Sequence, residues 1–450
     1  MRDRPSAILS RFARLAFGST IVLAPLRWRL TLAARPFPPV YRDYSDFLLY
    51  ASDLSMGATL IFWAGQLGLE RRRPKAGPWY LALPVAGLPA LGLVTAIGSV
   101  DAPLSLYHVL RLVLLGGLYL YVRNEVRSPS QLALPVAGLL LTQSAVGVSQ
   151  FLAQRSLGLE RLGELTLDPA WRGVSVVSAG GERILRAYGL ADHPNILGGC
   201  LALSLILLAA WHGEAERPWQ APLAGGLTGL GALALLLTFS RAAWLALAVG
   251  VVFAVALLSL VRPARPLRRW LSLLAAGLVV LLPFAWQNAE AIGVRLNQEG
   301  SFRQVAAERR SLDERAALIA AANQIFASDP LTGVGLGAFP TAMRQAVPIY
   351  PRDYQPPHIV LLEAGAELGV AGALLFLLAS LGPWFGLWSV RRRGWSPALI
   401  GASALLLALS VVGLFDYYPW LLPPGRIFQW LSWGLWASWF ESPAAGALHA

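Results

Sequence analysis

Hydrophobic residues occupy long runs along the whole chain, separated by short polar segments. Many of the runs approach the roughly 20 apolar residues that a helix needs to cross the hydrocarbon core of a bilayer. Most runs are apolar on all sides, as expected for helices surrounded by lipid and other helices. The pattern predicts twelve membrane spans, at residues 15–26, 46–69, 79–99, 103–121, 131–151, 194–211, 221–238, 242–261, 270–286, 358–390, 397–415 and 427–440. The first and last are short for a span, and we expect the long tenth segment to break near Pro383.

The composition supports an all-α, polytopic membrane bundle. Hydrophobic residues make up 56% of the chain and charged residues only 14%, whereas soluble domains contain about 25% charged residues. We expect nine spans within 1–286, with an extracytoplasmic loop at 153–192, then a large extracytoplasmic loop at 287–357, and three spans within 358–450. Residues 304–326 of the large loop contain no Gly or Pro and predict a helix.

Short basic loops indicate how the chain crosses the membrane. Such loops lie on the cytoplasmic side of membrane proteins. The basic residues that define this side are Arg71, Arg72, Arg73, Lys75, Arg123, Arg127, Arg262, Arg265, Arg268, Arg269, Arg391, Arg392 and Arg393. This orientation places both long loops outside. The sequence therefore predicts a multi-pass protein of the inner (cytoplasmic) membrane whose polar features lie on the extracytoplasmic face.

Charge and cysteine content exclude several classes of function. The net charge of +12 is typical of the positive-inside signal together with attraction to anionic lipid headgroups, and no nucleic-acid-binding module is visible. Cys200 is the only cysteine, so an intramolecular disulfide and a zinc site built on several thiolates are both excluded. Acidic residues are scattered along the chain. We therefore expect neither a metal nor a cofactor.

The candidate chemistry lies on the predicted outer face, in arginines and one histidine. The residues are Arg186, Arg241, a group in the large loop (Arg303, Arg309, Arg310 and Arg315) and His358, with which the tenth span begins. Guanidinium groups bind phosphate oxygens in a bidentate manner, and a neutral imidazole can accept a hydroxyl proton near neutral pH. Simpler interpretations stay open, because interfacial arginines reach toward headgroups and a lone histidine often only caps a helix. Arg111 lies within a span, and the sequence does not identify its acidic partner.

Small residues follow His358 along one side of the predicted helix. At about 100° per residue, Gly365, Gly369 and Gly372 project within about 40° of the histidine, a stripe that permits close packing of another helix. Glu363 and Glu367 project to the other side, so we do not expect either to contact the histidine directly.

The order of these motifs resembles that of the O-antigen ligase and polymerase superfamily. His358-Ile359, nine residues and then Gly369-Val370-Ala371-Gly372 match its histidine–GxxG pattern. The resemblance extends to a G-x-x-x-HPN-x-LGG segment at 189–199, the T-x-S-R motif at 238–241, an arginine followed by apolar residues at 315–319, and DPLTGVGLGAF at 329–339. Ile359 departs from the Asn, Ser or Gln that usually follows the histidine, which puts the type of acceptor in doubt.

The resemblance implies a GT-C-like, inverting glycosyltransferase that needs no metal. Its donor would be a glycan on a polyprenyl diphosphate in the outer leaflet of the bilayer, and its acceptor lipid A-core or another envelope molecule. Arg241 and Arg315 would bind the diphosphate with help from Arg186, and His358 would act as the general base. A polymerase that joins polyprenyl-linked repeat units is the alternative within the family. A membrane transporter is the alternative from another class, although transporters place their polar sites near the membrane midplane.

Overall fold

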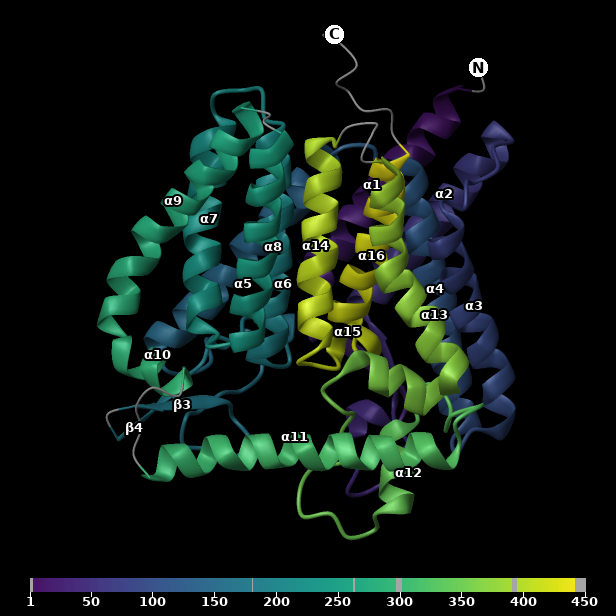
Figure 1. Cartoon of the computed structure of the whole chain (residues 1–450), viewed down its shortest axis with the longest axis vertical. Coiled ribbons are helices and arrows are strands. Elements are labelled where there is room, and N and C mark those ends of the chain that lie inside the picture. The colour runs from purple at the N-terminus through teal and green to yellow at the C-terminus, as the bar shows by residue number, and fades with distance from the viewer. Residues whose placement is uncertain (1–2, 180, 262–263, 297–301, 391–394, 442–450) are drawn as a thin grey trace.

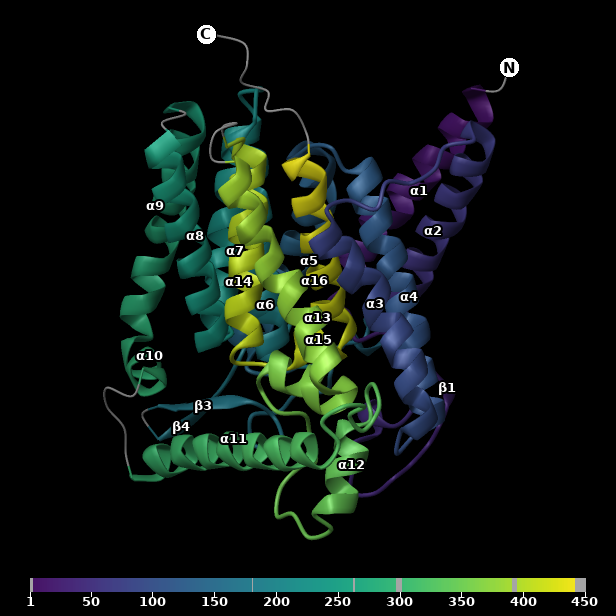
Figure 2. The ribbon, with the colours of Figure 1, turned by 45° about the vertical axis from the view of Figure 1, so that its right-hand side comes forward.

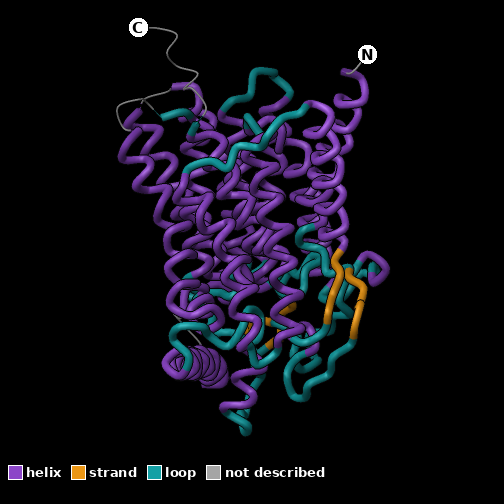
Figure 3. The backbone as a smooth tube through the Cα atoms, turned by 90° about the vertical axis from the view of Figure 1, so that its right-hand side faces the viewer, coloured by secondary structure: helices purple, strands orange, loops and turns teal. Residues whose placement is uncertain are grey.

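The structure is a computed structural model that describes residues 3–179, 181–261, 264–296, 302–390 and 395–441, apart from the side chains of 3–4, 302–311 and 389–390. It is a polytopic all-α membrane bundle, as the sequence predicts. The long helices run side by side, and both chain termini lie at one end of the bundle (Figure 1). The largest polar segments gather at the opposite end, called here the α11 end. The few strands lie there too (Figure 3).

Each predicted span corresponds to a helix of the bundle. The long helices are α1 (Asp3–Leu23), α2 (Ala51–Glu70), α3 (Trp79–Thr95), α4 (Ala102–Glu125), α5 (Ala133–Ala153), α6 (Pro194–Gly213), α7 (Gln220–Leu237), α8 (Arg241–Val261), α9 (Ala264–Gln287), α13 (Val360–Val390), α14 (Pro397–Gly413) and α16 (Pro423–Phe440). The shorter elements are β1 (Arg29–Ala33), β2 (Phe47–Tyr50), β3 (Val176–Ala179), β4 (Glu182–Leu185), α10 (Ala289–Arg295), α11 (Phe302–Ser328), α12 (Phe339–Ala346) and α15 (Tyr418–Leu421). Antiparallel pairing joins β1 to β2 and β3 to β4.

Within the described residues, nine of the long helices are long and apolar enough to cross a membrane by themselves. The exceptions are α14, which is apolar but shorter, and α2 and α16, which carry more polar residues. The first helix is longer than predicted and begins at Asp3, because Arg11 and Arg14 lie on its exposed side and do not end it.

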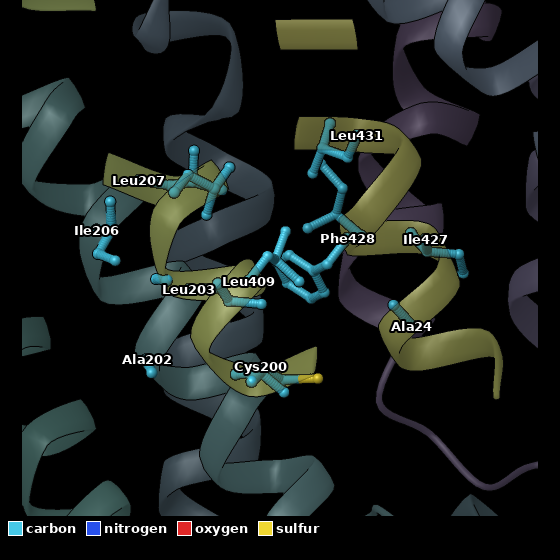
Figure 4. Close-up of a cluster of buried hydrophobic side chains, with 14 of the residues drawn as sticks. Ala24, Cys200, Ala202, Leu203, Ile206, Leu207, Leu409, Ile427, Phe428 and Leu431 are labelled. Carbon is cyan, nitrogen blue, oxygen red and sulfur yellow. The ribbon is translucent and has the colours of Figure 1, made fainter. Parts of the chain in front are cut away.

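Helix α6 forms the centre of the bundle. Every residue of its apolar window is buried, and it contacts α5, α7, α8, α9, α14 and α16. Figure 4 shows side chains from α6, α14 and α16 packed together around Cys200 and Phe428. The glycines Gly198 and Gly199 explain how α6 approaches its neighbours so closely. A Cβ atom at Gly198 would lie 3.0 Å from the Cβ of Ser240, and Gly199 leaves no room for any side chain beside Tyr418.

The long helix α13 is interrupted at Gly369, so the prediction of a break near Pro383 was wrong. Gly369 has φ 69° and ψ −169°, whereas Pro383 lies inside continuous helix. At the break, the carbonyls of Ala366 and Glu367 accept hydrogen bonds from the backbone of the glycine-rich loop at Val334 (3.0 Å) and Gly335 (2.9 Å). Loop hydrogen bonds thus replace those that the helix gives up. A proline can stay within a membrane helix when neighbouring groups satisfy the freed backbone carbonyl.

Because of this break, the small residues after His358 do not form the single helical stripe that we expected. The direction of the helix changes at Gly369, so Gly372 no longer continues the line from Gly365. His358 itself lies just before α13, in irregular backbone. The glycine at 369 serves a loop contact, not the close packing of another helix.

Helix α11 lies across the bundle at the α11 end, crosswise to the long helices (Figures 1 and 2). Its bounds confirm the predicted helix at 304–326. The second half of α11 packs through Leu318, Ala322 and Ile325 onto a separate apolar core that includes Phe339 of α12. This packing fixes the helix over the end of the bundle.

Arg111 has a partner that the sequence could not name. Its Nη2 atom donates to Asp53 of α2 at 3.1 Å and its Nη1 atom donates to the hydroxyl of Tyr107 at 2.6 Å. A buried charge is stable only when it is paired in this way. The pair ties α4 to α2.

Candidate functional site

A cavity of about 570 Å³ lies at the α11 end of the bundle. It brings together all four residues singled out in the sequence: Arg186, Arg241, Arg315 and His358. Their elements are far apart in the chain, because they belong to the loop before α6, the first residue of α8, the middle of α11 and the segment before α13. The complete lining is Ser175, Val176, Arg186, His193, Asn195, Ser240, Arg241, Ala242, Leu245, Arg295, Leu312, Glu314, Arg315, Gln355, His358 and Phe415.

Arg241 is positioned by the sharp turn that precedes α8. Phe239 in this turn is fully buried and adopts a left-handed conformation with φ 48°, which is rare for a residue other than glycine. Arg241 then donates from Nη1 to the carbonyl of Arg295 at 3.1 Å, and Arg295 donates from Nε to the carbonyl of Phe239 at 3.2 Å. The two arginines therefore join α8 and α10 at the cavity wall.

Arg186 is held in place by the protein itself. Its guanidinium donates to the carbonyl of Thr238 (2.6 Å), the hydroxyl of Ser175 (2.6 Å) and the amide oxygen of Asn195 (2.8 Å). The residue is only 3% exposed. These contacts connect the start of α6, the strand region of β3 and the turn before α8, so Arg186 braces the cavity wall that carries Arg241.

His358 faces the cavity with a carboxylate behind it. Its Nδ1 atom lies 3.7 Å from Oδ1 of Asp416. Asp416 also accepts hydrogen bonds from the amide of Asn195 at 3.1 Å and from the backbone N–H of Tyr417 at 3.0 Å. Since Nδ1 is directed toward the carboxylate, Nε2 is the nitrogen that can act on a molecule in the cavity. The arrangement follows the base-and-orienting-acid logic of hydrolase triads.

Two groups next to the histidine have shifted pKa values. Burial by itself raises the pKa of Asp416. The imidazoles of His358 and His193 and the amide of Asn195 lower it by more, so the pKa lies below its ordinary value. Asp416 is therefore ionised at neutral pH. Burial, followed by the charge of Arg186, lowers the pKa of His193 to about 3. His193 is neutral, and its Nδ1 accepts the N–H of Asn195 at 3.1 Å at the start of α6.

Helix α11 borders the cavity with charged residues. They lie on the face of the helix that packs against the rest of the protein. Arg315 precedes the buried Leu318 by one helical turn, so both lie on one face. Glu314 beside it accepts a hydrogen bond from the amide of Gln355 at 3.2 Å, which connects α11 to the segment that carries His358. The side chains of Arg303, Arg309 and Arg310 lie outside the described part of the chain.

Sequence reasoning missed Arg295, Asp416 and Asn195 as parts of the site. Asn195 stands in the HPN motif at 189–199, to which we assigned no chemical role. Asp416 follows the eleventh span directly, and a carboxylate at the end of an apolar helix was the available signal for it. Arg295 carries no such signal, because it is one of many arginines in a polar loop and only the fold brings it to Arg241.

Among the described residues, neither glutamate of α13 forms a hydrogen bond with His358, as their predicted directions imply. Glu367 accepts a hydrogen bond from the indole of Trp420 at 2.8 Å. The oxygens of Glu363 have no hydrogen-bond partner among the described residues. The same part of the chain contains no group of three or more His, Cys, Asp or Glu side chains placed to hold a metal ion.

A comparison with models of protein families finds a match to part of the chain. Residues 226–377 match the family model described as O-antigen ligase. The matched segment contains Arg241, Arg315 and His358 and includes the break at Gly369, whereas Arg186 precedes it. No curated protein matches the chain. The match confirms the resemblance to the O-antigen ligase and polymerase superfamily.

Proposed function

We propose that this membrane protein, which carries the O-antigen ligase domain of a family of membrane glycosyltransferases, transfers a glycan from a polyprenyl diphosphate carrier to an acceptor hydroxyl. The proposal is an inverting, metal-independent reaction on the extracytoplasmic face, with lipid A-core or another envelope molecule as acceptor. The observation that carries it is the cavity in which Arg241, Arg315 and His358 meet.

The arginines suit a diphosphate leaving group. When the bond between the anomeric carbon and the phosphate oxygen breaks, negative charge develops on the diphosphate. Guanidinium groups that are already in place stabilise this charge without the cost of reorganising water. Arg241 and Arg315 line the cavity from two different elements, α8 and α11, so a diphosphate in the cavity can be bound by both guanidinium groups. Arg186 acts as a positioning residue, since three of its N–H groups are engaged by the protein.

His358 supplies the proton acceptor. Its Nε2 atom removes the proton of the acceptor hydroxyl as the oxygen attacks the anomeric carbon from the side opposite the diphosphate. One bond forms between the acceptor oxygen and the anomeric carbon, and one bond breaks between that carbon and the diphosphate oxygen. The proton stays on His358, where the ionised Asp416 at 3.7 Å stabilises the imidazolium. The diphosphate leaves on the polyprenyl lipid.

The chain topology supports the proposed location. The termini and the described basic segments, at the ends of α2 and α4 and at the start of α9, share one end of the bundle, and the cavity lies at the other. If the basic loops face the cytoplasm of an inner-membrane protein, the cavity opens where a flipped lipid-linked glycan is available. The surrounding bilayer presents the lipid-borne donor directly to this end of the bundle.

The decisive experiment uses the purified protein reconstituted in vesicles with a polyprenyl diphosphate-linked glycan and candidate acceptors, including lipid A-core. Mass spectrometry identifies the products. Glycan on the acceptor establishes a ligase, whereas a longer glycan on the polyprenyl carrier establishes the polymerase alternative. If no new glycosidic bond forms with any donor and acceptor pair, while the lipid itself is moved across the bilayer, the protein is a transporter and the proposal is wrong.

A further inference from the structure

We propose that Arg295 is a third arginine that contacts the donor diphosphate. This inference rests on the proposed function and assigns a ligand to a residue outside the motifs that resemble the family's. Arg295 is the last residue of α10 and lines the cavity together with Arg241 and Arg315. The three residues come from three different elements, so they surround the same space from separate directions.

The position of Arg295 is fixed by its helix. Ala291 and Val294 of α10 are buried, at 2% and 9% exposure, and α10 contacts β3. The hydrogen bonds between Arg241 Nη1 and the Arg295 carbonyl, and between Arg295 Nε and the Phe239 carbonyl, attach this helix to the turn before α8. Both side chains also line the cavity, where an anion can meet the two guanidinium groups together.

The charge of the cavity lining favours such an anion. Among the described lining residues, four are arginines and one, Glu314, is a carboxylate. Asp416, which lies behind His358, does not line the cavity. A diphosphate diester carries two negative charges close together, and its oxygens match guanidinium forks that approach from different sides. A single phosphate would satisfy fewer of these groups, so the arrangement selects a diphosphate.

The structure also separates the two ways in which Arg295 could act. The bond from Arg241 ends on the backbone carbonyl of Arg295, so it survives any substitution of the Arg295 side chain. Removal of the side chain does remove the bond from Nε to Phe239. If Arg295 contacts the diphosphate directly, its removal weakens binding beyond the loss caused by removing Arg241. If it only supports the turn, its removal adds nothing once Arg241 is gone.

The test measures binding of two probes, polyprenyl diphosphate and polyprenyl monophosphate of equal chain length, to the full-length protein by calorimetry in detergent. We expect the wild type to prefer the diphosphate. Arg295→Ala and Arg295→Gln should each weaken diphosphate binding by about tenfold, as for the loss of one charge-assisted contact, with a smaller effect on the monophosphate. Arg172→Ala, at an exposed arginine outside the cavity lining, is the matched control and should bind like the wild type.

A double substitution completes the experiment. The losses in Arg241→Ala and Arg295→Ala should combine in the double variant if each residue contacts the lipid. Diphosphate binding that is unchanged in Arg295→Gln, or a double variant no weaker than Arg241→Ala alone, overturns the inference and leaves the proposed function intact. A wild type that does not prefer the diphosphate defeats the proposed function itself. If Arg295→Ala does not fold, the Gln variant, which keeps a hydrogen-bond donor for Phe239, gives the result.

Discussion

At the scale of single residues, the site combines one base with one orienting carboxylate. His358 lies in irregular backbone before α13, so its orientation depends on contacts from other elements. Asp416 is the charged contact, and Asn195 holds Asp416 in turn. Asn195 also accepts a hydrogen bond from Arg186. The positions of the base and of the cavity wall therefore depend on one connected set of side chains.

We expect His358→Ala to abolish glycan transfer and Asp416→Asn to reduce it by about 100-fold, within the range typical of general-base catalysis. The asparagine keeps the shape of Asp416 but cannot stabilise an imidazolium. Both rates are measured in reconstituted vesicles, and the melting temperature reports folding. Full activity in a folded His358→Ala variant would disprove the assignment of the base. An Asp416→Asn rate equal to the wild type would limit Asp416 to a structural role.

Arg241→Lys should also lose most activity, although the positive charge is kept. An ammonium group is a point charge and cannot present the planar fork of a guanidinium, and the bond to the Arg295 carbonyl at 3.1 Å depends on that fork. The expected result is a fall of at least tenfold in kcat/KM for the lipid donor. Arg172→Lys, at an exposed position outside the cavity, serves as the control. Equal donor kinetics in Arg241→Lys and wild type would contradict the proposed diphosphate contact.

His193 should make the protein less stable in mild acid. Its pKa is lowered to about 3 in the folded state, against about 6.5 for an unfolded histidine. The unfolded chain therefore binds the proton more readily, and stability falls as the pH decreases from about 6.5 toward 3. The limit is about 1.4 kcal/mol per pH unit, and water in the cavity that His193 lines reduces the effect further.

The measurement compares wild type with His193→Asn between pH 7 and pH 5, by intrinsic fluorescence of the 17 tryptophans. Asparagine is a good helix cap, so α6 should still begin at residue 194. The melting temperature of the wild type should fall more steeply with decreasing pH. Parallel curves for the two proteins would show that His193 is not held neutral in the folded state.

The sequence predicted four residues that line the cavity, because arginines and a histidine beside apolar runs stand out in a membrane protein. It could not predict Arg295 or Asp416 as their neighbours. The pairing of Arg295 with Phe239, and of Asp416 with Asn195, joins residues from separate elements. The hydrophobic periodicity of one segment does not show which residues of other segments it will contact.

At the scale of elements, the break in α13 explains two motifs together. Gly369 ends the first part of the helix, and the glycine-rich loop after α11 bonds to the carbonyls exposed there. Gly333, Gly335 and Gly337 in that loop all have positive φ values. A side chain at Gly333 would collide with the backbone of α13, and one at Gly335 or Gly337 would collide with α4 or the residues just before it. The glycine-rich loop and the break at Gly369 therefore form one contact, here called the joint. The joint positions α11, which precedes the loop, relative to the segment bearing His358, which precedes α13.

We expect Gly369→Ala to destabilise this joint and to reduce transfer activity. The backbone conformation at Gly369 (φ 69°, ψ −169°) is almost confined to glycine and costs another residue about 1–3 kcal/mol. The Cβ of an alanine would also collide with the carbonyl of Leu331. The melting temperature and the transfer rate should fall together. Gly57→Ala in α2, where nothing lies within 4 Å of the added atom, is the matched control and should leave both unchanged. A Gly369→Ala protein with wild-type values would show that the break is not required.

The sequence predicted element boundaries where the hydrophobic pattern changes. It missed the break in α13, whose position depends on a contact with another element. Helix α11 was predicted because residues 304–326 contain no helix breaker. The break in α13 was placed at Pro383 because proline interrupts isolated helices, whereas the structure breaks at Gly369, where a loop offers replacement hydrogen bonds. A glycine inside an apolar run gives no sign of such a partner.

At the scale of the whole molecule, the two ends of the bundle have different chemistry. The α11 end carries the cavity, α11 and both pairs of strands, whereas the other end carries the termini and short connections. Of the basic residues used to predict orientation, Arg262, Arg391, Arg392 and Arg393 lie outside the described residues. The others follow the ends of α2 and α4 or begin α9, at the same end as the termini.

The orientation in the membrane is open to a direct test, for which the single cysteine of the chain is well placed. Cys200 is 1% exposed, so it should react little with a membrane-impermeant maleimide. Arg172→Cys adds a thiol to the exposed loop before β3, and Arg217→Cys adds one to the exposed connection between α6 and α7 at the opposite end. In intact spheroplasts we expect the label on residue 172 only, and on both after lysis. The reverse pattern would put the cavity on the cytoplasmic side, against the orientation predicted from the short basic loops. A lipid-linked donor in the outer leaflet could then not reach His358.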